Sequence, residues 1–314
     1  AADEAGGAGD KNGHDFKFNS MNIVIAGGTG FIGTYLKKRF EEQGDIVKIV
    51  SRNINHIPWT HKSLVAELEG IDLLINLAGR SINCRHTDEN KEQILQSRLK
   101  STQLLGEAVS ACINPPKLWM NASASAIYKP SETVVSTEKT TDLATDFLGT
   151  VVAQWEKVLF GFENAKTRQV ALRTSVVLGR SDGAFPPLYN LARFGLGGQV
   201  GNGKQMFSWI HLEDYFRIIM FTVVNLNISG VINCTSPSPL SNAALMKVMR
   251  KNAGMPIGLP APVFAVKIGT WFIGTESDLL LNSSNFYPEV LINAGFKFKF
   301  KDVDGAIADL IHSK

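Results

Sequence analysis

MNIVIAGGTGFIG, residues 21–33, is the stretch that decides the fold of this chain. Residues 21–26 form a short apolar run rich in β-branched side chains, which predicts a buried strand. Residues 31–43 carry apolar side chains at helical spacing, and Gly44 follows as a stop signal, so they predict a helix. A strand, a glycine-rich turn and a helix in this order are the context that a dinucleotide fingerprint requires.

The glycines of the turn, Gly27, Gly30 and Gly33, have a physical purpose in such a context. Glycine lets the main chain turn tightly and come close to a pyrophosphate. The following helix N-terminus offers unpaired N–H groups and a partial positive charge to that anion. A glycine motif alone would also suit an ordinary tight turn, but with strand and helix both in place we predict a nucleotide-binding turn.

The composition is that of a globular protein, with 44% hydrophobic and 19% charged residues among 314. There are 32 basic and 29 acidic residues, and this net charge of +3 gives no reason to expect nucleic acid or an acidic membrane surface as a partner. No apolar run reaches the length of a membrane-spanning helix. The six histidines show no metal-ligand spacing, so no metal site is expected.

The cysteines and the first residues bear on the compartment and on the limits of the fold. Cys84, Cys112 and Cys234 are far apart and odd in number, which predicts neither a disulfide framework nor a zinc site. A reducing compartment fits best, so we expect a cytoplasmic protein, with an organelle matrix or stroma as the alternative. Residues 1–20 begin with a stretch rich in Gly, Ala and Asp without apolar period, which predicts a disordered tag or linker.

Apolar strands and helices alternate along the rest of the chain without an internal repeat. This alternation is typical of α/β proteins, and we predict a Rossmann fold, a doubly wound parallel sheet. We assign residues 21–235 to this NADP-binding domain, with lobe insertions at about 183–210 where glycines mark an irregular loop. Prolines break the later chain into short pieces, so residues 236–314 are expected to form a smaller C-terminal substrate lobe.

The choice of NADP over NAD comes from the end of the second predicted strand, residues 46–50. There Ser51 and Arg52 lie about 20 residues past the glycine turn, where a dinucleotide fold meets the adenine ribose. An NAD enzyme usually places Asp or Glu at this position to accept from the 2′-hydroxyl. A hydroxyl and a guanidinium suit a 2′-phosphate instead, so we predict NADP; the alternative is a solvated surface arginine.

Small and polar residues follow other predicted strands, whose carboxyl ends face the ligand crevice in such a sheet. In residues 76–79, Asn-Leu-Ala-Gly, small side chains would let the backbone lie against the adenosine part of the cofactor. Ser123, Ser125 and Tyr128 follow the strand that begins at Lys117 and are site candidates. His211 could carry a proton, although a histidine so placed more often caps a helix or packs between lobes.

Landmarks over residues 21–310 identify a family. They are Gly27-x-x-Gly30-x-x-Gly33, Asn76–Gly79, Ser97-Arg98, Ser123–Ala126, Arg173–Gly179, Ser208–Asp214 and Ala294–Phe296. With them the chain resembles the extended, atypical short-chain dehydrogenase/reductases, and more closely the subgroup described as epimerase family proteins or nucleoside-diphosphate-sugar epimerases. The resemblance implies a Rossmann NADP-binding domain with a small C-terminal lobe. It also allows a homodimer, because helices flanking the crevice commonly form dimers in that superfamily.

The chain departs from this superfamily in one respect. Catalysing members of the superfamily use a Tyr-x-x-x-Lys pair on the helix after the serine-containing strand, where lysine lowers the pKa of the tyrosine. The corresponding helix here, predicted over residues 146–162, has no such pair, and Tyr128 is followed four residues later by Glu132. The usual triad is therefore absent, as it generally is in the subgroup resembled.

Two functions follow. The first is an NADP-dependent oxidoreductase or epimerase that acts on an unknown small-molecule substrate with a non-standard acid/base, for which Ser125 and Tyr128 are the candidates. The second is a nucleotide-binding module without turnover, such as a redox sensor or an assembly subunit. Arg98 alone would be a solvated charge or a partner of the strand-end loop, and the resemblance adds it to the site. The expected cofactor-binding residues are Gly27, Thr29, Gly30, Phe31, Ile32, Gly33, Ser51, Arg52, Leu77, Ala78, Gly79, Arg98 and Ser123.

Overall fold

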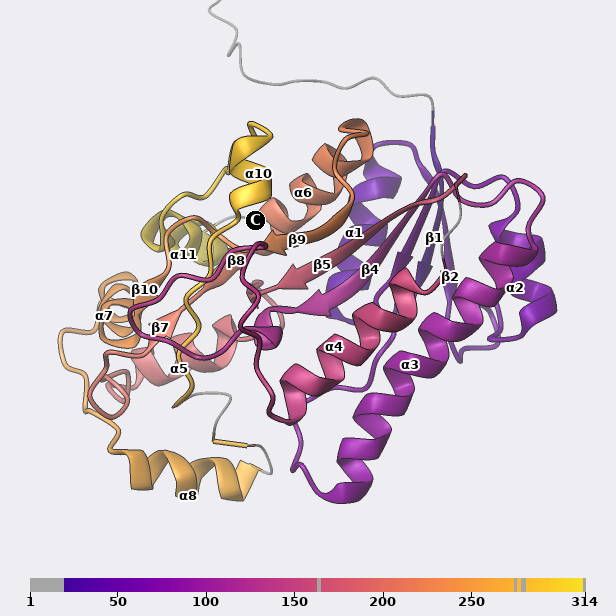
Figure 1. The fold of residues 1–314 in the computed structure, drawn as a ribbon. Helices are drawn as coiled ribbons and strands as arrows, with labels where there is room; N and C mark the ends of the chain where they lie inside the picture. The colour runs from indigo at the N-terminus through magenta and orange to yellow at the C-terminus, as the bar shows by residue number, and fades with distance from the viewer. Residues whose placement is uncertain (1–19, 163–164, 274–275, 278–280, 313–314) are drawn as a thin grey trace, which may run out of the picture.

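A computed structural model describes residues 20–162, 165–273, 276–277 and 281–312 of the chain. The expected tag or linker over residues 1–20 lies, apart from Ser20, outside the described residues. The centre of the molecule is one parallel sheet whose strands are β1 (Asn22–Ala26), β2 (Ile46–Val50), β3 (Leu73–Asn76), β4 (Leu118–Ala124), β5 (Arg168–Thr174) and β9 (Gly230–Cys234). Their order is β2-β1-β3-β4-β5-β9, and every neighbouring pair is parallel (Figure 1). The predicted Rossmann-like α/β fold is confirmed.

Helices cover both faces of this sheet because successive side chains of a strand point to opposite sides. Ile23 and Ile25 pack into the core of one face, and Val24 and Ala26 into the core of the other. The first face is covered by α1 (Phe31–Glu42) and α6 (Leu212–Val224), with α10 (Glu289–Asn293) beside β9. The second face is covered by α2 (His61–Leu68), α3 (Asp88–Ala111) and α4 (Phe147–Phe160) (Figure 1).

The sheet has its topological switch point at β1, since the chain continues from β1 to β2 on one side and later places β3 on the other. In such sheets a ligand crevice opens at the carboxyl ends of the strands beside that point. Backbone hydrogen bonds tie the loops together there. Gly27 N donates to the Val50 carbonyl at 2.9 Å, and Leu77 N donates to the Ala26 carbonyl at 2.8 Å.

A smaller lobe lies beside the carboxyl edge of the sheet and has a core of its own. Leu178 and Trp209 pack there with Leu245, Met249 and Ile307. The predicted boundary at residue 235 stays a prediction. The elements outside the main sheet are η1 (Ser125–Ile127), β6 (Val176–Leu178), α5 (Phe185–Arg193), β7 (Met206–Phe207), β8 (Trp209–His211), β10 (Leu240–Ser241), α7 (Asn242–Asn252), α8 (Val263–Ile273) and α11 (Val303–His312).

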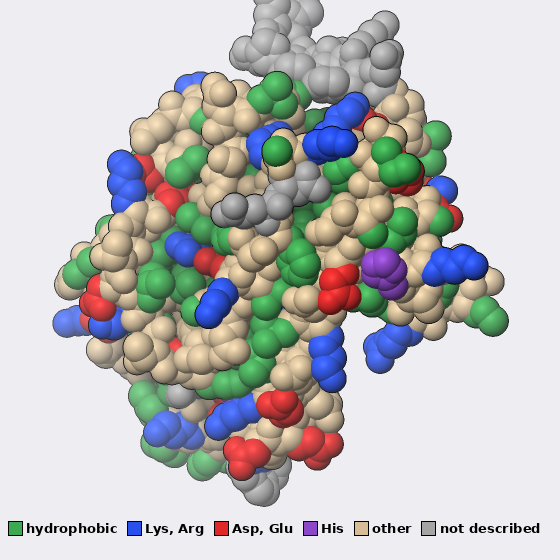
Figure 2. All heavy atoms as spheres, turned by 45° about the vertical axis from the view of Figure 1, so that its right-hand side comes forward, with side chains coloured by type: hydrophobic (Ala, Val, Ile, Leu, Met, Phe, Trp, Pro, Cys, Tyr) green, Lys and Arg blue, Asp and Glu red, His purple; other side chains and the backbone are tan. Residues whose placement is uncertain are grey.

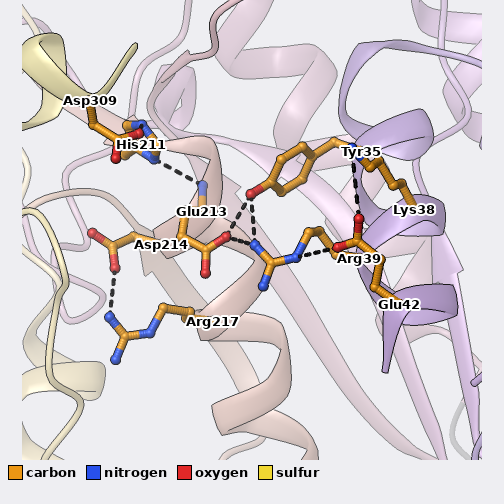
Figure 3. A network of polar contacts seen from close by, with 9 residues as sticks. All are labelled: Tyr35, Lys38, Arg39, Glu42, His211, Glu213, Asp214, Arg217 and Asp309. Carbon is orange, nitrogen blue, oxygen red and sulfur yellow. Dashed lines mark hydrogen bonds and ion pairs between the residues drawn. The ribbon is translucent and has the colours of Figure 1, made fainter. Parts of the chain in front are cut away.

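Polar contacts at the start of α6 join this lobe to the sheet domain (Figure 3). The His211 side chain accepts a hydrogen bond from Glu213 N at 3.1 Å and so caps α6, which confirms the capping interpretation. The Asp214 carboxylate accepts from the backbone N–H groups of Lys299 and Phe300, both at 2.8 Å. Glu213 accepts a 2.6 Å hydrogen bond from the Tyr35 hydroxyl of α1. The start of α6 therefore fixes both α1 and the segment that leads into α11.

Helix ends differ slightly from those predicted. The helix expected over residues 146–162 begins at Phe147, because Asp146 stays outside and its side chain caps the helix by accepting from Gly149 N at 2.9 Å. On the face shown in Figure 2, basic and acidic side chains of the described residues are interspersed, and neither sign gathers in one continuous patch. Within the described parts of the chain, every helix is too short or too polar to cross a membrane.

Candidate functional site

The glycine turn between β1 and α1 is built by close backbone approach. Gly27 has a φ of +76°, and a Cβ there would lie 2.8 Å from the backbone of Ala78. A Cβ on Gly33 would lie 2.5 Å from Gly28 Cα, so only glycine lets α1 start directly against the turn. Gly30 caps α1 without a side-chain hydrogen bond, and no acidic residue lies in the first helical turn. The helix N-terminus therefore presents its N–H groups to an anion.

A cavity of about 600 Å³ opens at this turn, at the carboxyl edge of the sheet. It is bounded by the start of α1, by the ends of β4 and β5, and by one face of α4. None of the described residues that line it is acidic, whereas Arg80 and Arg98 both contribute to the wall. The local charge therefore favours an anionic ligand.

Most of the expected cofactor-binding residues meet at this cavity, and four do not line it. Thr29 is exposed, and the Ala78 backbone lies against Gly27 under the turn. Ser51 and Arg52 lie at the end of β2, beside the turn but outside the cavity wall. The expected residues that line the cavity are Gly27, Gly30, Phe31, Ile32, Gly33, Leu77, Gly79, Arg98 and Ser123.

The end of β2 presents an exposed arginine above an ordered loop. The Ser51 side chain is buried, lies 2.8 Å from His56 Nδ1 and accepts a hydrogen bond from Asn53 N at 3.0 Å. Ser51 therefore shapes the loop through its own hydrogen bonds, while the Arg52 side chain is exposed. The structure leaves the guanidinium of Arg52 accessible to a ligand at this edge.

Arg98 of α3 belongs to the wall and is not a solvated charge. Its guanidinium donates to the carbonyl of Arg80 at 3.0 Å and lies 5.1 Å from the ring centroid of Trp155. Burial lowers the pKa of Arg98 to about 10. The interpretation of Arg98 as a partner of the strand-end loop is confirmed, and the interpretation as a solvated charge is wrong. Because Gly79 has no side chain, the arginine can lie directly on that loop.

A buried polar network stands behind the cavity at the end of β4. The Ser123 hydroxyl donates to Glu156 Oε1 at 2.6 Å. The Arg173 guanidinium holds both carboxylate oxygens of Glu156, at 2.8 and 2.7 Å. It also donates to the Tyr128 hydroxyl at 2.9 Å, and that hydroxyl donates to Asn233 Oδ1 at 2.8 Å. The network connects β4, α4, β5 and β9 and fixes the orientation of Ser123.

The two candidate acid/base residues face this network and the neighbouring backbone rather than the cavity. Tyr128 is 2% exposed, and burial raises its pKa despite the opposing charge of Arg173. The Ser125 hydroxyl donates to the carbonyl of Thr174 at 3.1 Å. Neither residue contributes to the cavity wall among the described residues. A catalytic role for them stays a prediction, and this geometry does not favour it.

The cavity-facing side of α4 is apolar, and this is the helix on which a Tyr-x-x-x-Lys pair would stand. Leu148 and Val152 lie four positions apart on the cavity wall, and so do Val151 and Trp155. Residues four positions apart lie on one face of a helix. Either pair therefore has the spacing of a Tyr-x-x-x-Lys pair, but its apolar side chains cannot exchange a proton.

Sequence reasoning did not single out several residues of the site. Arg80 and Trp155 form part of the wall, and Glu156 becomes a site residue only through Ser123 and Arg173. The sequence signal that could have pointed to Glu156 is its charge, because it stands among apolar residues of a predicted helix. Within the described parts of the chain, no group of three or more His, Cys, Asp or Glu side chains is placed to hold a metal ion.

Comparison with known proteins gives matches over nearly the whole folded chain. The profile of the NAD dependent epimerase/dehydratase family matches residues 23–234, and a domain of unknown function, DUF1731, matches residues 261–310. The chain is 34% identical to the epimerase family protein YfhF of Bacillus subtilis, over 93% of this chain and 98% of that protein. It is 32% identical to the mouse epimerase family protein SDR39U1, over 93% of this chain and all of that protein.

Solved structures agree with these sequence matches. The human epimerase family protein SDR39U1, crystallised with NADPH, superposes with a TM-score of 0.86 at 32% identity, covering 94% of this chain and all of that one. A nucleoside-diphosphate sugar epimerase from Corynebacterium glutamicum gives a TM-score of 0.74 at 28% identity, covering 92% of this chain and 58% of that one.

Proposed function

Since the chain belongs to the NAD dependent epimerase/dehydratase family, we propose that it binds NADP(H) in the cavity above residues 27–33 and acts as an oxidoreductase or epimerase. The observation that carries the proposal is the start of α1, which has no side-chain cap and opens on a cavity whose described lining residues include no acidic one. The NADPH in the structure of the human relative supports the same choice of cofactor here.

The residues present fit a phosphorylated dinucleotide. A Cβ on Gly30 would have no protein atom nearer than 3.8 Å, so the glycine leaves open space at the helix start for a diphosphate. Arg80 and Arg98 place positive charge on the wall. The exposed Arg52 at the end of β2 suits a 2′-phosphate, which only NADP carries.

When bound, the cofactor supplies hydride chemistry, and the protein supplies binding and orientation. The first turn of α1 would hold the diphosphate through its N–H groups. Ser123 offers a hydrogen-bond acceptor at the end of β4, because its proton is donated to Glu156. The apolar face of α4 excludes water from that part of the cavity. We keep Ser125 and Tyr128 as candidate proton donors.

The alternative function is a nucleotide-binding module without turnover, such as a redox sensor or an assembly subunit. One observation favours it: the residues of α4 that line the cavity at i, i+4 spacing, Leu148 with Val152 and Val151 with Trp155, are apolar, whereas catalysing members of the superfamily carry a tyrosine and a lysine at this spacing. Such a module would keep the glycine turn because ligand binding stabilises the folded state. The cofactor proposal is common to both functions, and only turnover separates them.

The partners and compartment that we propose follow from the sequence. We expect a small-molecule substrate, no nucleic acid or membrane partner, and a homodimer as the candidate assembly. The free thiols of Cys84, Cys112 and Cys234 fit a reducing compartment, either the cytoplasm or an organelle matrix or stroma.

Titration of the purified protein with NADPH and NADH, followed by calorimetry, tests the proposal. We expect NADPH to bind at least tenfold more tightly than NADH. No binding of either nucleotide at millimolar concentration would overturn the proposal. NADPH binding without any loss of absorbance at the nicotinamide band, across a panel of carbonyl compounds and sugar nucleotides, would select the module without turnover.

A further inference from the structure

The hydroxyl groups around the cavity differ in whether their proton already makes a hydrogen bond within the protein or can be donated to a ligand. Ser123, Thr174 and Tyr215 line it from β4, β5 and α6. Each hydroxyl has one proton to donate. The Ser123 proton is used in the bond to Glu156, and Thr174 Oγ1 donates to the carbonyl of Leu172 at 2.9 Å. Both of these residues therefore face a ligand as acceptors.

Tyr215 differs from them because its hydroxyl makes no hydrogen bond among the described residues; the Thr174 hydroxyl is the side chain near enough to interact with it. The residue is 1% exposed, and its hydroxyl has no hydrogen-bond partner among the described residues. Buried polar groups are nearly always paired, because an unpaired one loses its bonds to water without replacement. Burial also raises the pKa of Tyr215 well above its ordinary value, so the hydroxyl keeps its proton.

The position of the hydroxyl is fixed by the surrounding core. The Tyr215 ring packs in the same apolar cluster as Ile25 and Phe216, against the face of the sheet that α1 and α6 cover. Ile32 of the glycine turn and Val177 of β6 also pack on this cluster, and both line the cavity. Tyr215 itself belongs to the cavity lining, together with Ile32 and Val177.

We propose that Tyr215 is a ligand-binding residue whose hydroxyl donates a hydrogen bond to an oxygen of the dinucleotide bound in this cavity. The inference rests on the proposed function, since a dinucleotide must bind there. Phosphate and ribose oxygens are abundant acceptors on such a ligand, while its ribose hydroxyls and carboxamide can donate to Ser123 and Thr174. The three hydroxyls then form a complementary set, with one donor and two acceptors.

The test is Tyr215→Phe, with Tyr35→Phe as the matched control. Tyr35 also has a partly buried hydroxyl on the same face of the sheet. This hydroxyl donates a hydrogen bond to Glu213, and Tyr35 does not line the cavity. We expect Tyr215→Phe to raise the Kd for NADPH about 5- to 20-fold, which corresponds to the loss of one hydrogen bond. The thermal midpoint of the nucleotide-free variant should stay equal or rise, because an unpaired hydroxyl is removed. Tyr35→Phe should lower that midpoint and leave the Kd for NADPH within twofold.

The outcomes separate the two proposals. Wild-type protein that binds no NADPH overturns the proposed function, and this inference with it. Wild-type protein that binds NADPH while Tyr215→Phe binds it equally well overturns the inference alone. A Tyr215→Phe variant with a lowered midpoint and unchanged Kd would show that the hydroxyl has a partner inside the protein, and this also overturns the inference.

Discussion

Glu156 and Arg173 form a two-pronged ion pair inside the protein, with Arg173 Nη2 2.7 Å from Glu156 Oε2 and both side chains at most 10% exposed. The pair stands directly behind Ser123, so the cavity wall depends on it. A buried pair of this kind costs free energy to desolvate, yet removing one partner leaves an uncompensated charge.

Replacing Glu156 by Gln should therefore lower the free energy of unfolding by about 3–5 kcal/mol, because the Arg173 charge stays buried without its counter-charge. Urea unfolding measures the change. Glu41→Gln is the control: Glu41 pairs with Lys37 one helical turn away, its side chain is 43% exposed, and its loss should cost less than about 1 kcal/mol. Equal effects of the two substitutions would contradict the prediction.

His211 should make stability depend on pH in one window. Burial lowers its folded-state pKa to about 4; Asp309 opposes the shift and Lys299 adds to it. The unfolded chain takes up this proton near pH 6.5, so between pH 6.5 and 4 it binds more protons than the folded chain. The free energy of unfolding should fall as pH falls through this window, by on the order of 3 kcal/mol in all.

His211→Asn isolates that contribution, because asparagine can still accept the capping hydrogen bond of α6 but does not titrate. Chemical unfolding of both proteins at several pH values between 7 and 4 should give curves that converge or cross as the wild type loses more stability. Other titrating groups contribute equally to both and cancel in the difference. Parallel curves would show that His211 does not titrate in this range.

Two glycines of the turn should respond differently to alanine. A Cβ on Gly33 would lie 2.5 Å from Gly28 Cα, so Gly33→Ala should destabilise the fold by about 1–3 kcal/mol. Apart from its chain neighbours, a Cβ on Gly30 would meet only Gly27 O, at 3.8 Å. Gly30→Ala should therefore cost less than about 1 kcal/mol. It should still weaken NADPH binding more than tenfold, because the methyl group would fill the space expected to hold the diphosphate. Thermal unfolding measures the change in stability, and calorimetry measures the change in NADPH affinity.

Arg52 should decide between the two nicotinamide cofactors. Its exposed guanidinium at the end of β2 suits the 2′-phosphate of NADPH and has no counterpart on NADH. Arg52→Ala should lower NADPH affinity about tenfold, leave NADH affinity unchanged, and leave the thermal midpoint of the free protein within a degree or two. An undiminished preference for NADPH would remove Arg52 from the site.

Much of the architecture could be predicted from local sequence. The strand, glycines and helix of residues 21–44 are each specified by near neighbours in the chain, through β-branched side chains, backbone freedom and helical spacing. The family was predicted from such landmarks and is confirmed. His211 was expected to cap a helix or pack between lobes, and it caps α6.

The site could be predicted only in part, because its chemistry depends on partners far apart in the chain. The sequence left Arg98 as either a solvated charge or a partner of the strand-end loop, and only folding places it on the loop of Arg80 and over Trp155. Tyr128 appeared as a candidate acid, yet its hydroxyl is engaged by Arg173 and Asn233, which lie 45 and 105 residues away. Hydrogen-bond commitments of this kind leave no trace in local spacing.

The sequence by itself determined where the chain turns after β1 and predicted where an anion binds, since glycine conformations and helix starts are properties of a few consecutive residues. Only the tertiary structure decided which side chains face the cavity and which protons they still have to give. Packing of α4 and α6 on the sheet makes Ser123 donate its proton to Glu156, while the Tyr215 hydroxyl makes no hydrogen bond among the described residues. The physical reason is that a hydrogen bond is a relation between two groups in space, and the chain brings those groups together only when it folds.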